Sequence, residues 1–230
     1  ELIRKFKYLA PEYYARAYEF YNIYHPIETD PFIPLETKKE KMVEWWTKHV
    51  KWMGECGISK EVVQKIVREQ EFGARDGLGE FVELLHRKNI PFLIFSASVT
   101  DMIEGFLKKE GWLHPNIHVV SNKYQFNDKG MVVGYESGII HSYNKSEASI
   151  AHRPYFSDIH SRKNILLLGD TLDDVGMLEG SGYENVIKIG FLNDDVEKKL
   201  DAYQKAFDVV ILNDGPMDFV NELLQEILSE

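Results

Sequence analysis

The first third of the chain repeats its apolar residues at helical spacing and contains few strand signals. This pattern predicts three helices, over residues 11–24, 36–53 and 59–70. The dipeptides His25-Pro26 and Asp30-Pro31 are expected to break the chain after the first helix, because the residue before a proline is pushed out of helical geometry.

Small residues mark the ends of the other two helices. Gly54 and Gly57 are expected to end the second helix, since glycine suits the left-handed residue that follows many helices. Ser59 is expected to be the N-cap of the third, where its hydroxyl can accept a backbone N–H.

After Gly77 the pattern changes to short apolar runs that alternate with amphipathic stretches. Strands are expected over residues 91–95, 117–121, 165–168, 186–189 and 209–212, a hairpin over 124–126 and 131–135, and helices over 78–88, 99–111, 194–205 and 216–228. Repeated strand–helix units of this length predict an α/β fold with a parallel sheet and helices on both faces. We expect a helical region over residues 1–74 and an α/β core over residues 75–230.

The strand expected at residues 165–168 ends in a cluster of acids. Gly169 ends the apolar run, and Asp170, Asp173 and Asp174 follow before the next helix begins. In open α/β sheets the carboxyl ends of the strands line the ligand crevice. Carboxylate oxygens at that edge suit Mg²⁺, which needs only one or two protein carboxylates and keeps several waters.

A structural role explains the same acids almost as well. Asp170 would then simply end the strand, while Asp173 and Asp174 would cap the following helix and meet the positive end of its dipole.

Two further polar residues lie at strand ends or in loops. Ser96 directly follows the strand expected at 91–95 and precedes a helix whose free backbone N–H groups could receive an anion. Lys145 lies in a later loop and could balance phosphate charge. A hydroxyl, a lysine and a Gly-Asp-x-x-x-Asp strand end, in this order, resemble the haloacid dehalogenase superfamily of phosphatases.

Composition excludes several other classes. The 230 residues carry a formal charge of -10, which argues against a nucleic-acid or anionic-membrane partner. No apolar run is long enough to span a membrane, and Cys56 is the single cysteine, so we expect a cytoplasmic location without disulfides. No phosphate-binding glycine loop, paired histidine motif or Gly-x-Ser-x-Gly elbow is present.

Several longer segments resemble the cytosolic 5′-nucleotidase III family. The matching segments are Met42-Val-Glu-Trp-Trp-Thr-Lys48, Ile94-Phe-Ser-Ala97, His114-Pro-Asn-Ile-His-Val-Val-Ser-Asn122, Leu166-Leu-Leu-Gly-Asp170 and Ile187-Lys-Ile-Gly-Phe-Leu-Asn-Asp194. The resemblance implies a Rossmann-like haloacid dehalogenase core with a helical cap domain. It also implies a magnesium-dependent 5′-nucleotidase that binds a small nucleoside monophosphate, and we expect a monomer.

The resemblance assigns roles to individual positions. It implies that Ser96 and Ala97 bind the phosphate and that Lys145 neutralises it. Asp170 matches the magnesium ligand, and Asp174 matches the second acid of the same motif, which we count with Lys145 as catalytic.

The family has a pyrimidine branch and a branch that prefers 7-methylguanosine monophosphate. Glu28 matches the acid from the cap that reads the base. Trp46 offers an aromatic face on which a positively charged 7-methylguanine would stack, and His49 follows at helical spacing in the same pocket. We therefore expect 7-methylguanine, with pyrimidine as an equal competitor. Plain core packing explains at least one of Trp45 and Trp46.

One family motif is missing from the sequence. The reaction of the family runs through an aspartyl-phosphate and needs an Asp-x-Asp-x-Thr motif, which supplies the nucleophile and the acid; no such motif precedes Glu28. The usual spacing of this motif in the family implies that it lies upstream of Glu1, and the chain does not begin with Met. The alternative is a catalytically silent nucleotide-binding protein.

Overall fold

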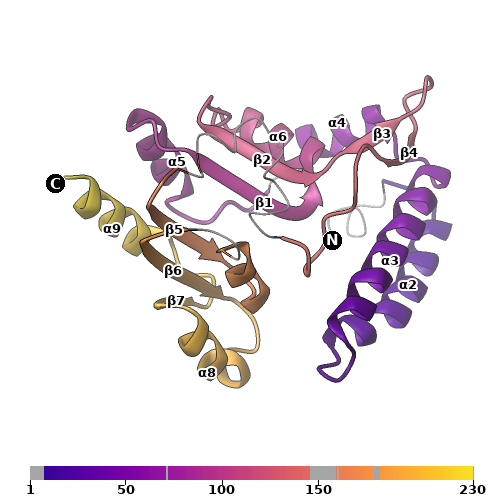
Figure 1. Ribbon diagram of the computed structural model, residues 1–230. Helices are drawn as coiled ribbons and strands as arrows, with labels where there is room; N and C mark the ends of the chain where they lie inside the picture. Colours follow the sequence, from indigo (N-terminus) through magenta and orange to yellow (C-terminus); the bar gives the residue numbers. More distant parts are fainter. Residues whose placement is uncertain (1–7, 71, 146–158, 160, 179–181, 230) are drawn as a thin grey trace. The chain divides into compact units, whose positions relative to one another are not determined.

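Figure 1 shows the computed structural model, which describes residues 8–70, 72–145, 159, 161–178 and 182–229. The predicted helices of the first third are α2 (Glu12–Thr29), α3 (Leu35–Glu55) and α4 (Lys60–Glu69). The first two of these pack side by side along their length (Figure 1). Their shared core, here called the aromatic core, consists of three aromatic residues and one methionine: Phe20, Tyr24, Trp45 and Met42.

The predicted break at His25-Pro26 is wrong, since α2 continues through Pro26 to Thr29. Pro26 lies in the last turn, so its missing N–H removes only one hydrogen bond before the helix ends. Ile27 packs against the aromatic core and holds that final turn in place. The second break is confirmed: Asp30, which precedes Pro31, is extended.

Gly54 was expected to end α3, but the helix continues to Glu55. A Cβ atom at Gly54 would lie 2.0 Å from the carbonyl oxygen of Val132, so this glycine allows the helix to approach a strand backbone. The predicted turn falls at Gly57, whose φ is +100°. Ser59 caps α4 as predicted and accepts the N–H of Val62 at 3.2 Å.

Three strands form the parallel sheet that the second half of the sequence predicts. They are β5 (Asn164–Gly169), β6 (Asn185–Leu192) and β7 (Val209–Leu212), in the order β5-β6-β7. Helix α8 (Val196–Ala206) packs against β6 and β7, and α5 (Leu78–Arg87) packs against α9 (Asp218–Leu228). The acids expected before a helix instead enter a 3₁₀ helix, η2 (Leu172–Leu178).

The other strands also follow the prediction, with one difference. Strand β1 (Phe92–Val99) pairs with β2 (Ile117–Asn122), and β3 (Tyr124–Phe126) pairs with β4 (Val132–Tyr135) in an antiparallel hairpin. Strand β1 was expected to end at Phe95 but runs on to Val99, so that Ser96 and Ala97 lie inside the strand, near its C-terminal end. Helix α6 (Thr100–Lys109) follows it directly.

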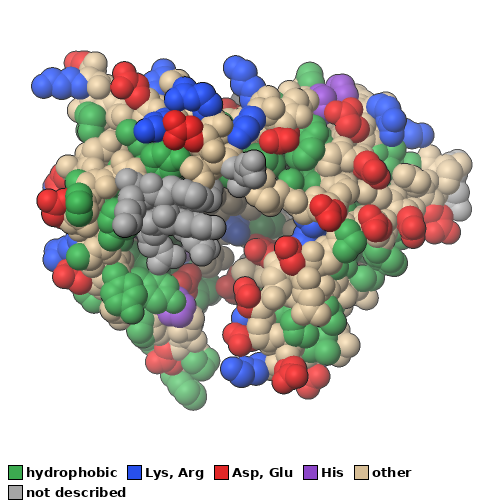
Figure 2. Space-filling model, turned by 180° about the vertical axis from the view of Figure 1, so that it is seen from behind, with side chains coloured by type: hydrophobic (Ala, Val, Ile, Leu, Met, Phe, Trp, Pro, Cys, Tyr) green, Lys and Arg blue, Asp and Glu red, His purple; other side chains and the backbone are tan. Residues whose placement is uncertain are grey.

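The chain forms two compact units, each assembled from separate segments. One contains residues 1–71, 94–113 and 119–144, and the other contains residues 72–93, 114–118 and 145–230. The division at residue 74 remains a prediction. Among the described residues, no helix is both long and apolar enough to cross a membrane. Acidic and basic side chains are interspersed on the face drawn in Figure 2.

The close approach at Gly54 gives a stability prediction. Gly54→Ala should destabilise the protein by about 1–3 kcal/mol, because the added methyl group meets a backbone oxygen that cannot rotate away. Denaturant unfolding would measure this loss. Gly138→Ala is the control: no atom lies within 4 Å of its Cβ position, and its stability should change by less than about 0.5 kcal/mol. Equal effects of the two substitutions would contradict the close approach.

Candidate functional site

The carboxylate of Asp174 organises the loop at the end of β5. One of its oxygens, Oδ2, accepts the backbone N–H groups of Asp170 and Thr171, each at 3.0 Å. The other, Oδ1, accepts Lys145 Nζ at 3.1 Å. The Asp174 side chain is only 4% exposed, so this is a buried ion pair whose acid is fully hydrogen-bonded.

The structural alternative for these acids is therefore correct in part. Asp174 does bind backbone N–H groups, but it does so from within η2, reaching back to the turn that leaves β5. Gly169 makes this possible, because a Cβ atom there would lie 2.7 Å from Asp174 Cβ. A larger residue at Gly169 would push the carboxylate away from the turn.

Asp170 lies at the mouth of this loop. Its backbone carbonyl accepts the Tyr203 hydroxyl at 2.6 Å, while its side chain still reaches solvent. Desolvation by the surrounding protein, together with the negative charge of Asp174, raises the pKa of Asp170 above its usual value. Lys145 opposes this shift only in part.

The exposed carboxylate of Asp170 could hold a magnesium ion, whereas both oxygens of Asp174 are already hydrogen-bonded. A cation beside Asp170 would offset both the desolvation and the charge of Asp174 that raise its pKa, and Mg²⁺ is commonly held by one or two carboxylates with water completing its shell. The described residues contain no cluster of three or more His, Cys, Asp or Glu side chains with metal-binding geometry. A protein-rich cage of the kind that zinc prefers is thus not found in that part of the chain.

Ser96 and Ala97, the predicted phosphate-binding residues, lie near the end of β1. Ser96 Oγ accepts the N–H of Ser98 at 3.1 Å, and the Ala97 carbonyl accepts Asn122 Nδ2 at 2.8 Å. Val99, the N-cap residue of the following α6, makes no side-chain capping bond. Val99 therefore does not cap the first N–H groups of α6, which are the groups that the sequence suggested for an anion.

Asn122 is a residue whose importance the sequence did not reveal. Its side chain is buried, and besides Ala97 it binds both backbone groups of Ile140, at 2.9 Å and 2.8 Å. It thus ties the end of β1 to the loop of residues 139–144. Asparagine is frequent in loops of any kind, so only the contacts identify this one.

Glu28 lies in the last turn of α2, where the same loop reaches it. Ser142 Oγ donates to Glu28 Oε1 at 2.9 Å. The Glu28 backbone carbonyl accepts both the Tyr143 hydroxyl and Lys38 Nζ, the latter at 2.8 Å. Neither Ser142 nor Tyr143 was predicted to take part in the site.

The two adjacent tryptophans of α3 differ in burial. Trp45 belongs to the aromatic core, as expected for one of them, whereas Trp46 is half-buried at its edge. Trp46 stacks on Trp45 with 5.3 Å between ring centroids and on His49 with 5.6 Å. His49 Nε2 also lies 2.8 Å from the Tyr13 hydroxyl.

The predicted site residues fall into two groups. Lys145, Asp170 and Asp174 come together in one compact unit. The other unit contains the remaining candidates, which are Glu28, Trp46, His49, Ser96 and Ala97. Within it, Trp46 and Tyr143 pack against the same aromatic core, so Glu28 and Trp46 border one cluster.

Comparison with known families gives these residues a context. A family profile described as "Pyrimidine 5'-nucleotidase (UMPH-1)" matches residues 1–228. The chain belongs to this pyrimidine 5′-nucleotidase family. The enzyme class expected from the sequence, a phosphoric monoester hydrolase, is thereby confirmed.

Two curated relatives carry more specific names. The 7-methylguanosine phosphate-specific 5′-nucleotidase A of Xenopus laevis is 41% identical over 211 residues, which are 91% of this chain and 73% of that protein. The 7-methylguanosine phosphate-specific 5′-nucleotidase of Homo sapiens is 39% identical over 208 residues, or 90% and 69% of the two chains.

Solved structures confirm the predicted fold class. A crystal structure of cytosolic 5′-nucleotidase IIIB bound to cytidine has a TM-score of 0.81 and 33% identity, and the match covers 96% of this chain and 74% of that one. A phosphoserine phosphohydrolase-like protein from Francisella tularensis, with a TM-score of 0.54 and 14% identity over 88% of this chain and 82% of that one, shares the fold alone.

The loop of residues 139–144 also contains a buried histidine. His141 Nδ1 accepts the N–H of Tyr143 at 3.2 Å, and Asn144 Oδ1 accepts the N–H of His141 at 2.8 Å. Burial, with a smaller contribution from the charge of Lys39, lowers the pKa of His141 to about 4. The ring is therefore neutral at physiological pH and able to accept this bond.

The depressed pKa predicts acid sensitivity. Between about pH 4 and 6.5 the unfolded chain binds a proton at His141 that the folded chain does not, so stability is full above this range and falls as the pH falls. At pH 5 the loss should be about 2 kcal/mol. Denaturant unfolding at pH 7 and pH 5 would measure it. His141→Asn keeps a hydrogen-bond acceptor that does not titrate, so this variant should lose less stability between pH 7 and pH 5. Equal losses in the wild type and the variant would contradict the role of His141 in the acid sensitivity.

Proposed function

We propose that this protein is a magnesium-dependent 5′-nucleotidase that hydrolyses nucleoside 5′-monophosphates to nucleoside and phosphate. The observation that carries the proposal is the buried Lys145–Asp174 pair, joined through backbone N–H groups to Asp170, in a chain of this family. A cytoplasmic location belongs to the same proposal and is supported by the name of the relative cytosolic 5′-nucleotidase IIIB.

Each residue of the loop after β5 has a distinct part in this scheme. Lys145 presents an ammonium group to the phosphoryl oxygens and lowers the cost of charge that develops on them. Asp174 is the positioning acid, because its contacts to Lys145 and to the Asp170 N–H fix both groups. Asp170 would hold the magnesium ion, which when bound neutralises phosphate charge.

The proposed reaction also needs groups that bind the phosphate and a nucleophile that attacks phosphorus. Ser96 and the backbone near Ala97 bind phosphoryl oxygens through a hydroxyl and uncapped N–H groups at the start of α6. An aspartyl-phosphate route also needs a nucleophilic aspartate from an Asp-x-Asp-x-Thr motif, which the sequence 1–230 does not contain. Nucleotide binding without turnover is therefore the second candidate function.

For the base we propose 7-methylguanine in first place and a pyrimidine in second. The names of the relatives from Xenopus laevis and Homo sapiens support the first, and the cytidine-bound neighbour supports the second. Trp46 is half-buried beside the aromatic core, and a cationic purine stacked on its ring would gain more than a neutral pyrimidine would. Glu28 offers a carboxylate to the amino group of either base.

The first test measures magnesium-dependent phosphate release from 7-methylguanosine monophosphate and from CMP by the full-length protein. Asp170→Asn should lower turnover at limiting magnesium by at least about 100-fold, because one charged ligand is lost. The control is Asp201→Asn, an exposed acid on α8, which should behave as wild type.

The outcomes separate the two candidate functions. Binding of both nucleotides without phosphate release would favour the silent binding protein. Wild-type turnover in Asp170→Asn would remove Asp170 from the metal site. Absence of both binding and release would reject both functions.

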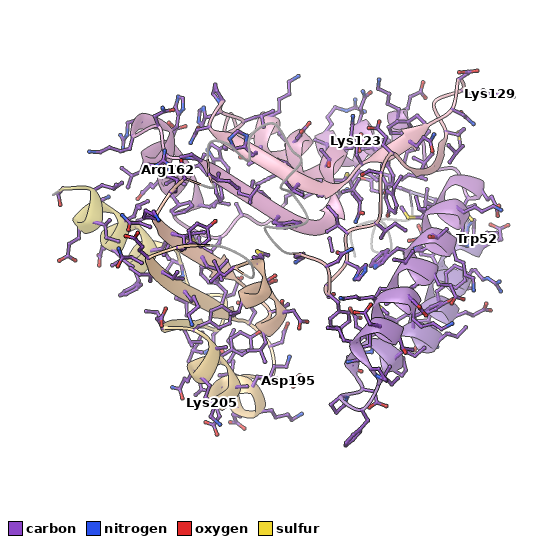
Figure 3. All side chains as sticks on the ribbon, viewed as in Figure 1. Trp52, Lys123, Lys129, Arg162, Asp195 and Lys205 are labelled. Atoms are coloured by element: carbon purple, nitrogen blue, oxygen red, sulfur yellow. The ribbon has the colours of Figure 1, made fainter. Side chains whose placement is uncertain are left out.

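Substitution of Trp46 tests the proposed base preference. Trp46→Ala should lower kcat/KM for 7-methylguanosine monophosphate about five- to tenfold more than kcat/KM for CMP, because cation–π stacking is lost. The ratio of kcat/KM for the two substrates measures this. Trp52→Ala is the matched control (Trp52 is labelled in Figure 3), since it packs against the same core from another face of α3 and should leave the ratio unchanged. Equal ratios in all three proteins would exclude Trp46 from base selection.

A further inference from the structure

The structure suggests how Glu28 is held in place. We propose that Ser142 and Tyr143 are positioning residues for Glu28, and that Ser142 sets substrate affinity by fixing one carboxylate oxygen and leaving the other for the base. This inference rests on the proposed function, because it deepens the role of Glu28 in that site. It stands on contacts between α2 and the loop of residues 139–144, all within one compact unit.

Glu28 has an unfavourable position for a fixed carboxylate. It lies in the last turn of α2, where the backbone carbonyl dipoles are negative and repel an anion. A glutamate side chain also loses considerable rotamer freedom when it is held in one conformation. An external donor is therefore needed if the carboxylate is to meet a base in a defined orientation.

Ser142 supplies that donor. Its hydroxyl lies 2.9 Å from Glu28 Oε1, and both side chains are half-buried, so the bond is shielded from competing water only in part. A hydroxyl bound to a carboxylate is a charge-assisted hydrogen bond, which is stronger than one between neutral groups. With Oε1 held by Ser142, we assign Oε2 as the oxygen that accepts from an amino or ring N–H group of a base.

Tyr143 holds the backbone beneath the carboxylate. Its hydroxyl donates to the Glu28 carbonyl, which also accepts Lys38 Nζ at 2.8 Å. The same ammonium group lies 5.3 Å from the centroid of the Tyr143 ring, and the ring packs against the aromatic core. The end of α2 is thus fixed by two donors that also contact each other.

The loop that carries both residues has a fixed conformation of its own. Asn144 Nδ2 donates to the Ile139 carbonyl at 2.7 Å, and Asn122 binds Ile140 through both its N–H and its carbonyl. Together with the contacts of His141, these bonds define the backbone on each side of Ser142. Because this backbone is fixed, the Ser142 hydroxyl occupies one position. A donor on an unrestrained loop would sample many positions.

The test measures Kd and KM for CMP and 7-methylguanosine monophosphate in the full-length protein. Ser142→Ala should raise both constants about tenfold with little change in kcat, because a charge-assisted hydrogen bond that organises binding is lost. Ser142→Thr keeps the hydroxyl and should restore the wild-type values. An unchanged thermal unfolding midpoint would show that the fold is intact.

A double-mutant cycle distinguishes positioning from a general structural effect. In a Glu28→Ala background, Ser142→Ala should have no further effect on Kd, because the group that it positions is absent. Independent, additive losses would overturn the inference, as would wild-type constants in Ser142→Ala. If Ser142→Ala does not fold, Tyr143→Phe serves in the same cycle, since it removes only the hydroxyl.

Failure of the proposed function has a different signature. In that case the wild-type protein neither binds nor hydrolyses the two nucleotides, whatever the state of Ser142. If the wild-type protein acts on both and the cycle is additive, only the positioning role is wrong.

Discussion

A single buried carboxylate determines the geometry at the end of β5. Asp174 receives Lys145 Nζ and the N–H groups of Asp170 and Thr171, and it has almost no contact with solvent. Lys145 and Asp170 are both proposed to act on the phosphate of a nucleotide. Asp174 therefore positions both of these groups. The absence of a side chain at Gly169 is what lets this carboxylate fit against the turn.

Elsewhere, polar contacts between distant segments define the candidate base site. The loop of residues 139–144 has little regular secondary structure, yet asparagine side chains hold it at several backbone groups. From this loop, Ser142 and Tyr143 reach the end of α2. The candidate base site is built on irregular backbone that side chains stabilise, whereas the sheet is stabilised by the hydrogen bonds between its own strands.

The sequence predicted the fold well where local chemistry decides it. Ser59 as a cap and the apolar strand before Gly169 follow from residue type and period, and the parallel pairing of β5, β6 and β7 follows from the alternation of strands and helices. Pro26 and Gly54 were misread because tertiary packing overrides local preference: Ile27 secures the turn after the proline, and the backbone of β4 requires a glycine inside α3.

The candidate site likewise contains some residues that a sequence motif reveals and others that only the fold brings together. Asp170 and Asp174 share a motif, so sequence alone marks them, and the structure adds the different contacts that each one makes. Glu28 and Ser142 lie 114 residues apart, and no local pattern connects a serine in one loop with a glutamate at the end of a helix. Contacts of that separation require the folded chain.

The segmented make-up of the first compact unit has a consequence for biosynthesis. Gly54 of α3 packs against the backbone of β4, but α3 leaves the ribosome long before β4 does. Some of the residues between these two elements belong to the other compact unit. Chains generally fold domain by domain from the N-terminus as they are made. We therefore expect the β4-facing side of α3 to stay uncovered in the nascent chain until β4 has been synthesised.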